Sequence, residues 1–414
     1  SEIQGLGVLG FAFRGTDAMA MPAFNKTLAE TDCVSCGQCR IYCPTGAISI
    51  KTHMDEVWEA IADPDTRVVA QVAPAVRVAV WDAFGLDKGN SVMGKLVAVL
   101  HRMGFDEVYD TAFSADLTIM EESKEFLERL GDSSKLPLFT SCCPAWIRFA
   151  ETRHPDILPY ISTCKSPMEM FGAVLKEYYK EKDAEEEKST ISVAIMPCVA
   201  KKMEAVREEF KRDGIPDVDY VITTKELIRM IRESGIQFDE IDPEAPDMPF
   251  SISSGAGVIF GVTGGVTEAA LRRLVQEKST QALRDIKFSG IRGMEGVKEA
   301  LLELNGRTLR IGVVSGLGNA DDLIEKIKSG EEHFDFVEVM ACPYGCIAGA
   351  GQPFCHKVDK KERIDGMYRS DKAAPIKRSE ENPVIYTLYN NGGLLEGREH
   401  ELLHVHYAGA HAHE

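Results

Sequence analysis

Three apolar segments of this chain run directly into cysteine-bearing loops, and this pattern constrains the fold more than any other. The segments read LFTSCCPAW at 138–146, VAIMPCVAKKME at 193–204 and FVEVMACPYGCIAGAGQP at 336–353. Open parallel sheets bind their ligands at the carboxyl ends of the strands. Cysteines at three such ends can therefore converge in space although they lie far apart in the sequence.

These loops hold one cysteine more than a four-iron cubane needs. The set is Cys142, Cys143, Cys198, Cys342 and Cys346. A lone cysteine after a buried strand is most often a core residue. Three such loops, one with a C-x3-C pair, make that interpretation weak. The glycines that follow Cys346 allow the backbone to approach a bulky cofactor closely.

Short apolar segments alternate with amphipathic ones, which predicts an α/β fold with parallel sheets flanked by helices. The predicted strands are 67–74, 107–110, 136–141, 192–197, 219–224, 309–316 and 335–341. The predicted helices are 94–104, 121–131, 166–180, 224–235 and 268–277. The charged stretch 177–190 predicts a solvated linker between two lobes. From about residue 356 the polar, irregular pattern predicts a tail that wraps a core or lies on the surface.

A compact cysteine module precedes these segments. Cys33, Cys36, Cys39 and Cys43, followed by Pro44, have the C-x2-C-x2-C-x3-C-P spacing of bacterial ferredoxins, which predicts a 4Fe–4S cluster. A zinc site is the main alternative, although zinc knuckles rarely combine such short gaps with C-P. In two-cluster ferredoxins the fourth cysteine of such a run ligates the other cluster. Either Cys43 folds back onto the same cluster, or an upstream partner segment is absent.

The 414 residues carry a formal net charge of −18, which disfavours nucleic acid and anionic membranes as partners. No window approaches the roughly 18 unbroken apolar residues of a membrane helix. The N-terminal residues lack the basic region and cleavage site of a signal peptide, so we expect a cytoplasmic protein. An odd total of 11 clustered cysteines fits metal binding or catalysis better than disulfides.

The three cysteine loops closely resemble the three signature motifs of FeFe-hydrogenases, and the ferredoxin-like module precedes them as it does in that family. The resemblance extends from about Phe11 to Tyr407. It implies a two-lobed catalytic domain around a buried H-cluster that makes or consumes molecular hydrogen. The expected organisation is a lead segment at 1–30, a ferredoxin-like 4Fe–4S module at 31–60, the catalytic domain at 61–355 and a C-terminal wrapping segment at 356–414.

The resemblance also implies which residues hold the H-cluster. Cys143, Cys198, Cys342 and Cys346 would ligate its cubane, and Cys346 would bridge to a two-iron subcluster with carbonyl, cyanide and azadithiolate ligands. Lys201 would hydrogen-bond one cyanide. The other residues that would contact the cofactor are Ala73, Pro74, Met196, Phe260 and Met340.

Glu122, Glu125 and Arg129 recur at i, i+3 and i+7, so they share one face of a helix. In isolation such charges usually indicate a solvated salt-bridge face. The resemblance instead implies a proton relay from Cys142 through Glu122, Ser162 and Glu125 to Arg129 at the surface. The Cys142 thiol would be its first proton carrier.

The resemblance implies the partners as well: protons and H2, a ferredoxin-like electron carrier reached through the N-terminal cluster, and maturation proteins that deliver the diiron subcluster. Some positions near the cofactor depart from the family pattern. They are Ala75, Ala145, Met168, Tyr344, Ala348 and Ala350. Since every ligand and relay residue is kept, we expect altered electrostatics, catalytic bias or oxygen response, with the cofactor retained.

Three alternatives are weaker. A hydrogenase-like iron–sulfur assembly factor lacks the full set of cysteines around the first motif, which is intact here. A sensory hydrogenase tends to lose the proton-carrying cysteine and carries a signalling domain. A plain ferredoxin-type electron carrier does not explain the cysteines at the strand ends.

Other residues of chemical interest give weaker indications of function. Cys164 and Cys355 have no partner at ligand spacing, so we expect core or surface thiols. The glycine-rich stretch 254–266 lacks the GK[ST] of a phosphate loop, which makes a nucleotide site a weak prediction. The histidines of the tail predict adventitious metal binding at most. They are His400, His404, His406, His411 and His413.

Overall fold

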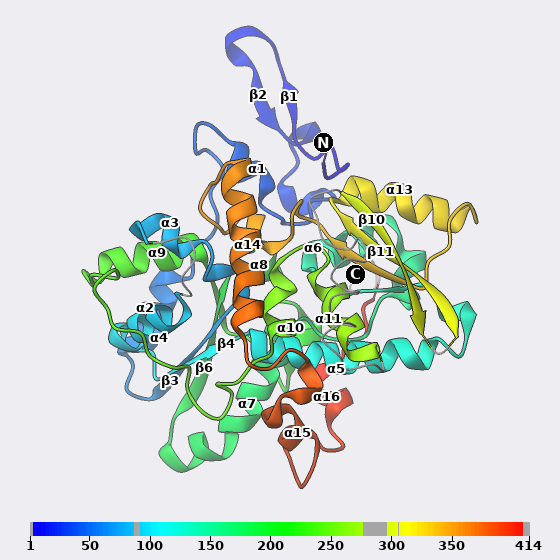
Figure 1. Ribbon diagram of the computed structural model, residues 1–414. Coiled ribbons are helices and arrows are strands. Elements are labelled where there is room, and N and C mark those ends of the chain that lie inside the picture. The colour runs from blue at the N-terminus through cyan, green and yellow to red at the C-terminus, as the bar shows by residue number, and fades with distance from the viewer. Residues whose placement is uncertain (1–2, 87–91, 276–295, 305, 409–414) are drawn as a thin grey trace.

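The structure, a computed structural model, describes residues 3–86, 92–275, 296–304 and 306–408. Two four-stranded sheets form its core and lie on opposite sides of the view in Figure 1. Helices pack against both sheets, as the alternation of segments predicts. The α/β class, with parallel sheets and flanking helices in two lobes, is therefore confirmed.

The first sheet has the strand order β4-β3-β6-β9, and its neighbouring strands are all parallel. The strands are Glu107–Asp110 (β4), Thr66–Val72 (β3), Ser189–Met196 (β6) and Tyr220–Thr223 (β9). The central strands β3 and β6 are mostly buried and rich in apolar residues, as parallel strands covered on both faces are. Their sheet packs against Met54–Ala62 (α2), Met93–Met103 (α4), Pro167–Glu186 (α7) and Thr224–Glu233 (α9).

The second sheet has the order β10-β11-β12-β5, in which only β10 is antiparallel to its neighbour. Its strands are Val297–Leu304 (β10), Arg307–Ser315 (β11), Phe336–Met340 (β12) and Leu138–Phe139 (β5). The sequence does not predict β10, because VKEALLEL is rich in helix formers. Pairing with β11 overrides this propensity and buries Lys298, Ala300 and Leu304 on one face of the strand.

Helix α5 (Ala112–Arg129) carries the chain from the first sheet to the second, since it follows β4 and precedes β5. It begins earlier than the predicted helix at 121–131. The short helix α10 (Gly255–Val258) packs against it so closely that a Cβ atom at Gly257 would lie 2.1 Å from the carbonyl oxygen of Ala112. This glycine of the 254–266 stretch therefore serves helix packing.

The stretch 177–190 is largely exposed to solvent, as predicted, but the prediction of a linker is wrong. Helix α7 continues to Glu186, and β6 begins at Ser189. Tyr179 is buried, and its hydroxyl lies 2.6 Å from that of Tyr109. Arg67 donates hydrogen bonds to carboxylates of the helix end, to Asp183 at 3.0 Å and to Glu186 at 2.5 Å. Most of the charged stretch is thus the exposed end of α7, which Arg67 pairs to β3.

The polar C-terminal region is helical where an irregular chain was expected. Its helices are Lys357–Ala373 (α14), Pro383–Tyr389 (α15) and Glu399–Leu403 (α16). Buried Arg272, on α11 (Gly265–Leu274), donates to Asp371 of α14 at 2.8 Å. Buried Asp116 of α5 accepts hydrogen bonds from Ser379 at 2.8 Å and Asn382 at 3.2 Å. These bonds fix the region to the core; His411 and His413 lie outside the described residues.

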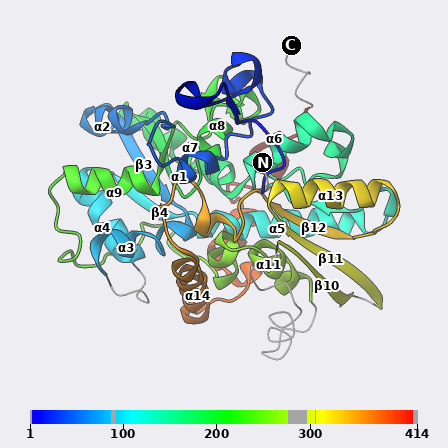
Figure 2. The same cartoon turned by 90° about the horizontal axis from the view of Figure 1, so that it is seen from above.

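The N-terminal region projects from the body as a hairpin of Gly10–Ala12 (β1) and Met19–Met21 (β2) in Figure 1. The cysteine module follows and includes the short helix Gln38–Tyr42 (α1). Figure 2 shows α1 near the middle of the molecule, between α2 and α9 on one side and α13 (Leu317–Lys328) on the other. Among the described residues, no helix is both long and apolar enough to cross a membrane.

Candidate active site

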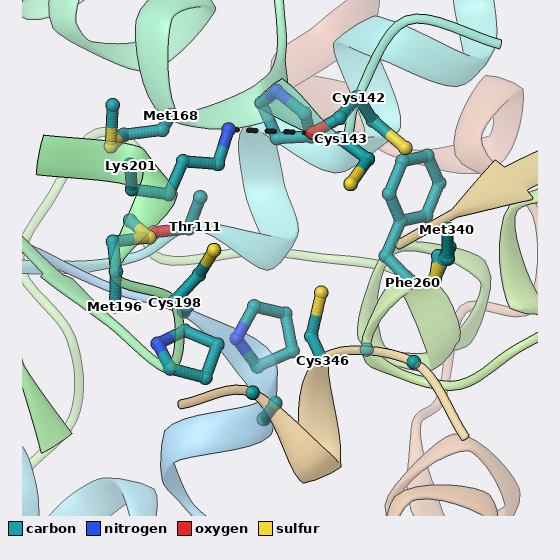
Figure 3. Close-up of a pocket in the computed structure, with 18 of the residues that line it drawn as sticks. Thr111, Cys142, Cys143, Met168, Met196, Cys198, Lys201, Phe260, Met340 and Cys346 are labelled. Atoms are coloured by element: carbon teal, nitrogen blue, oxygen red, sulfur yellow. Dashed lines mark hydrogen bonds between the residues drawn. The ribbon is translucent and has the colours of Figure 1, made fainter. Parts of the chain in front are cut away.

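One cavity receives the three strand-end loops. Cys142 and Cys143 reach it after β5, Cys198 after β6, and Cys342 and Cys346 after β12. Figure 3 shows the sulfur atoms of Cys143, Cys198 and Cys346 directed toward the same space. The structure thus brings together all five cysteines that the sequence places at strand ends.

Local geometry explains why these loops reach one cavity. Cys143 precedes α6 (Pro144–Arg153), and Pro144 occupies the first helical position, where its missing N–H costs no hydrogen bond. The amide of Ala341 donates to the Cys143 sulfur at 3.5 Å, which joins the first loop to the third. A Cβ atom at Gly349 would lie 2.3 Å from the carbonyl oxygen of Pro197, so only glycine lets the third loop pack on the second.

The donor set fits an iron–sulfur cubane. Burial raises the pKa of the thiols of Cys143, Cys198 and Cys342, and it raises that of Cys346 to about 12. Thiolates in so apolar a cavity need a strong compensating charge, which iron supplies directly. Four thiols that converge in an apolar cavity therefore match a bound metal cluster, since soft thiolates are the ligands that such clusters prefer.

Lys201 supplies the charged side chain of the cavity. It lies on α8 (Ala200–Glu204), where its ammonium donates to Glu204 at 2.5 Å and to the carbonyl oxygen of Cys142 at 3.4 Å (Figure 3). Burial lowers the pKa of Lys201, but the charge and hydrogen bond of Glu204 raise it overall. The side chain therefore stays an ammonium that can bind an anionic ligand in the cavity.

The remaining residues expected to contact the cofactor also line the cavity, as do two of the positions that depart from the family pattern. They are Ala73, Pro74, Met196, Phe260 and Met340, together with Ala75 and Met168. Thr111, which was not predicted from the sequence, also lines the cavity and donates from Oγ1 to Gln71 at 3.3 Å. No sequence motif identifies Thr111. It reaches the cavity because it immediately precedes α5, and the start of α5 was not predicted from the sequence.

The N-terminal module touches the cavity loops. Gln38, which the sequence analysis also missed, donates from Nε2 to the sulfur of Cys342 at 3.2 Å and to the carbonyl oxygen of Ala348 at 3.3 Å. Burial raises the pKa of the nearby Cys36 thiol to about 11, and the charge of Cys143 contributes to this rise. The module and the cavity are therefore adjacent.

Within the module, Cys43 has surroundings of its own. Cys33, Cys36 and Cys39 line one pocket together with N-terminal residues such as Ile3 and Leu9, whereas Cys43 does not line it. The sulfur of Cys43 lies 3.4 Å from the hydroxyl of Thr45, whose hydrogen bond lowers the pKa of Cys43 to about 6. Cys43 nevertheless lies close to Cys39, because burial raises the pKa of the Cys39 thiol and the charge of Cys43 adds to this rise.

The predicted relay residues lie in series beside the cavity. Ser162 donates to Glu125 at 2.8 Å, and Arg129 donates to the same carboxylate at 2.5 Å. Burial raises the pKa of Glu122 to about 8; the charge of Glu125 adds to this rise, and a hydrogen bond from Ser162 opposes it. Burial and the charge of Glu122 hold the pKa of Cys142 well above its ordinary value.

Arg129 lies at the edge of the protein, where its side chain is 11% exposed. The guanidinium also donates to the carbonyl oxygens of Pro159, at the exposed surface, and of Ile161. Cys164, expected in the core or on the surface, is fully buried, and its sulfur lies 3.9 Å from Glu125. Cys355 is partly exposed.

Comparisons with known families agree with this geometry. Residues 66–350 match the family of the iron only hydrogenase large subunit, C-terminal domain. The chain belongs to the iron-only hydrogenase family. Residues 28–49 match the 4Fe-4S binding domain, and residues 357–409 match the iron hydrogenase small subunit, a relationship that the sequence analysis did not anticipate.

Individual relatives support the assignment. The chain is 47% identical to the NADP-reducing hydrogenase subunit HndD of Solidesulfovibrio fructosivorans over 98% of this chain and 71% of that protein. It is 41% identical to iron hydrogenase 1 of Clostridium pasteurianum over 88% of this chain and 65% of that protein. A solved structure of a variant of the [FeFe]-hydrogenase HydA1 from Chlamydomonas reinhardtii superposes with a TM-score of 0.73 at 39% identity, covering 87% of this chain and 99% of that chain.

More distant similarity reaches another kind of protein. The chain is 32% identical to the cytosolic iron-sulfur assembly component 3 of Rattus norvegicus, over 91% of this chain and 83% of that protein. Family membership makes this hydrogenase an oxidoreductase that acts on H2. It also implies an H-cluster and a 4Fe–4S cluster as cofactors.

Proposed function

We propose that this hydrogenase catalyses the reversible reaction 2 H+ + 2 e− = H2 in the cavity between the two sheets. The observation that carries the proposal is the set of four ligand thiols around one apolar space, with a fifth thiol, Cys142, beside it. When bound, the H-cluster supplies the iron at which the H–H bond forms or breaks. The protein has to hold that cluster, exclude water and move protons and electrons.

Four cysteines would hold the cofactor: Cys143, Cys198, Cys342 and Cys346. Lys201 would face an anionic ligand, because its ammonium lies in the cavity wall and stays charged. Met196, Met340 and Phe260 would enclose the diiron part, and Ala73 and Pro74 leave room beside it. Their apolar surfaces keep water out, which strengthens every charge interaction inside the site.

Protons would travel between Cys142 and Arg129. The thiol of Cys142 keeps its proton at neutral pH, since burial raises its pKa. Glu122, whose pKa is about 8, is the next group that can accept and release a proton near neutral pH. The bonds from Ser162 and Arg129 to Glu125 continue the series away from the cavity.

Electrons would enter through the N-terminal module, because Gln38 joins that module to the sulfur of Cys342. A ferredoxin-like carrier suits this entry, since an iron–sulfur cluster passes electrons singly. We further predict that the protein is cytoplasmic. We also predict that maturation proteins deliver its diiron subcluster.

An assembly-factor function is the second candidate, because relatives of that kind share about a third of the residues. Such a role needs cluster binding but no proton path. The series of buried Glu122, buried Ser162 and half-buried Glu125 beside a free thiol therefore favours hydrogen chemistry.

Infrared spectroscopy separates these functions. The chain would be matured with a synthetic diiron precursor, and its CO and CN stretching bands and its H2 evolution with a reduced dye would be measured. We expect both bands and turnover in the wild type and in Cys355→Ala, and no bands in Cys346→Ala. Wild-type protein without the bands after maturation would exclude the hydrogenase function. Bands with only a trace of turnover would favour a sensory role.

A further inference from the structure

We propose that His404, in the C-terminal tail, is a positioning residue of the proton relay: it fixes the segment 161–165, which carries Ser162. The proposal rests on the proposed function, because it assumes that Ser162 and Glu125 conduct protons. It assigns a role to a part of the chain that lies outside both the cavity and the cysteine module.

The backbone of the tail pairs directly with this segment. Cys164 and His404 form an isolated antiparallel bridge. The amide of Val405 donates to the carbonyl oxygen of Thr163 at 2.7 Å, and the amide of Lys165 donates to that of Leu403 at 2.8 Å. On its other side, the segment is bonded to β5 through the amide of Ser162. Residues 161–165 are therefore held between the second sheet and the tail.

The imidazole of His404 joins the segment to the relay helix. Its Nδ1 lies 2.8 Å from the hydroxyl of Thr163, and its Nε2 lies 3.1 Å from a carboxylate oxygen of Glu121 on α5. A carboxylate can only accept, so Nε2 carries a hydrogen and donates it to Glu121. Tyr389 donates to the other oxygen of Glu121 at 2.5 Å. Burial raises the pKa of Glu121, but the bonds from His404 and Tyr389 lower it overall, so the carboxylate stays charged.

This bond network sets the position of two relay groups. The amide of Thr163 donates to Glu125 at 3.0 Å, and the hydroxyl of Ser162 donates to the same carboxylate at 2.8 Å. Glu121 and Glu125 lie one turn apart on α5, so the imidazole ties Thr163 to the helix next to the relay carboxylate. A displacement of about 1 Å at a reacting group can cost about a hundredfold in rate. Loss of the imidazole would loosen the step between Ser162 and Glu125.

The test compares His404→Ala with a matched control in the same tail. His400 suits the control: its ring lies 4.5 Å from that of His404, but in the described structure it makes no hydrogen bond to α5 or to residues 161–165. In His404→Ala we expect about tenfold slower H2 turnover, a larger solvent deuterium isotope effect and an unchanged KM for the electron donor. The CO and CN bands should match those of the wild type. His400→Ala should behave as the wild type, and His404→Gln, which keeps a donor and an acceptor, should recover most of the turnover.

A second measurement needs no cofactor. In the protein without its diiron subcluster, His404→Ala should speed the deuterium exchange of the amides of 162–165 at least tenfold, while those of β3 stay unchanged. Unchanged exchange, or turnover and isotope effect at the wild-type level, would overturn the proposal. If His404→Ala does not fold, Thr163→Val removes the same bond from the other side and must meet the same criteria. Wild-type protein that lacks both bands and turnover would instead mean that the proposed function has failed.

Discussion

Arg363 on α14 donates a hydrogen bond of 3.1 Å to the carbonyl oxygen of Ile347, the residue that follows Cys346. The same guanidinium donates to Asp82 at 3.1 Å and to the carbonyl oxygen of Pro353 at 3.2 Å. The region that matches the small subunit thus holds the third cysteine loop from outside the cavity.

Replacing Arg363 should therefore weaken both the fold and the loop. Arg363→Met removes the hydrogen bonds of the buried guanidinium to the carbonyls of Ile347 and Pro353 and to Asp82, and we expect a loss of about 2–3 kcal/mol in the free energy of unfolding. Lys361→Met, at an exposed position of the same helix, should stay within about 0.5 kcal/mol of the wild type. Urea unfolding followed by circular dichroism measures both. Equal stability of the two variants would mean that the guanidinium is not an anchor.

Cys142→Ala should stop proton delivery and leave the clusters in place. The variant keeps every proposed ligand, so its CO and CN bands should persist, while H2 evolution should fall at least about a hundredfold, the usual range for a lost proton-transfer group. Cys355→Ala is the control, because Cys355 does not line the cavity. Activity of Cys142→Ala near that of the wild type would contradict the relay.

The pKa of Glu122, about 8, makes the stability of the protein depend on pH. The folded state keeps a proton that the unfolded chain releases above about pH 4.3, so stability falls as the pH rises from there toward 8. Glu122→Gln cannot titrate. Relative to the wild type, the variant should gain up to about 1.4 kcal/mol per pH unit across this window. Urea unfolding of the protein without its diiron subcluster, measured across this pH range, tests this prediction, with Glu128→Gln at an exposed position as the control. If the free energies of unfolding of the wild type and of Glu122→Gln changed in parallel with pH, the raised pKa of Glu122 would be refuted.

The N-terminal cluster should tolerate the loss of Cys43 better than the loss of Cys39. Cys39 lines a pocket with Cys33 and Cys36, whereas Cys43 does not. We expect Cys39→Ser to lose most of the electron paramagnetic resonance signal of this cluster, together with about four irons per chain. Cys43→Ser should keep most of both. Equal losses would show that Cys43 ligates the same cluster.

Two substitutions test how the departures from the family pattern tune the site. Ala75 and Met168 both line the cavity, and the carbonyl oxygen of Met168 accepts a hydrogen bond from Gln71 at 3.0 Å. Ala75→Ser and Met168→Gln add polar atoms beside the cofactor, so we expect a changed ratio of H2 oxidation to H2 evolution, with the cofactor retained. Film electrochemistry measures this ratio. Traces that match the wild type would contradict the prediction.

The parallel strands could be predicted because burial on both faces forces apolar runs such as that of β3. Local patterns failed where a distant partner decides the structure. The charges at 177–190 correctly indicate solvent exposure but wrongly suggest a linker, because the helix end there is held by Arg67, far away in the sequence, which pairs with Asp183. The composition of β10 favours a helix, and the segment forms a strand only because it pairs with β11.

The same distinction holds for the site. The cysteines could be predicted because an iron–sulfur cluster is ligated by cysteine thiolates at characteristic spacings, and such spacings can be recognised in the sequence. Gln38, Arg363 and His404 act through single hydrogen bonds to backbone or side-chain groups that no spacing identifies. Gln38 and Cys342, for example, are 304 residues apart.

Helices α14 to α16 match a family described as a small subunit, yet here they continue the catalytic chain. Docking of this region is therefore an intramolecular equilibrium, in which the tether maintains an effective concentration in the millimolar range. A separate subunit would dissociate once its concentration fell below the Kd of the complex. Dilution should not remove Arg363 from the third cysteine loop or His404 from the relay, so specific activity should be independent of enzyme concentration.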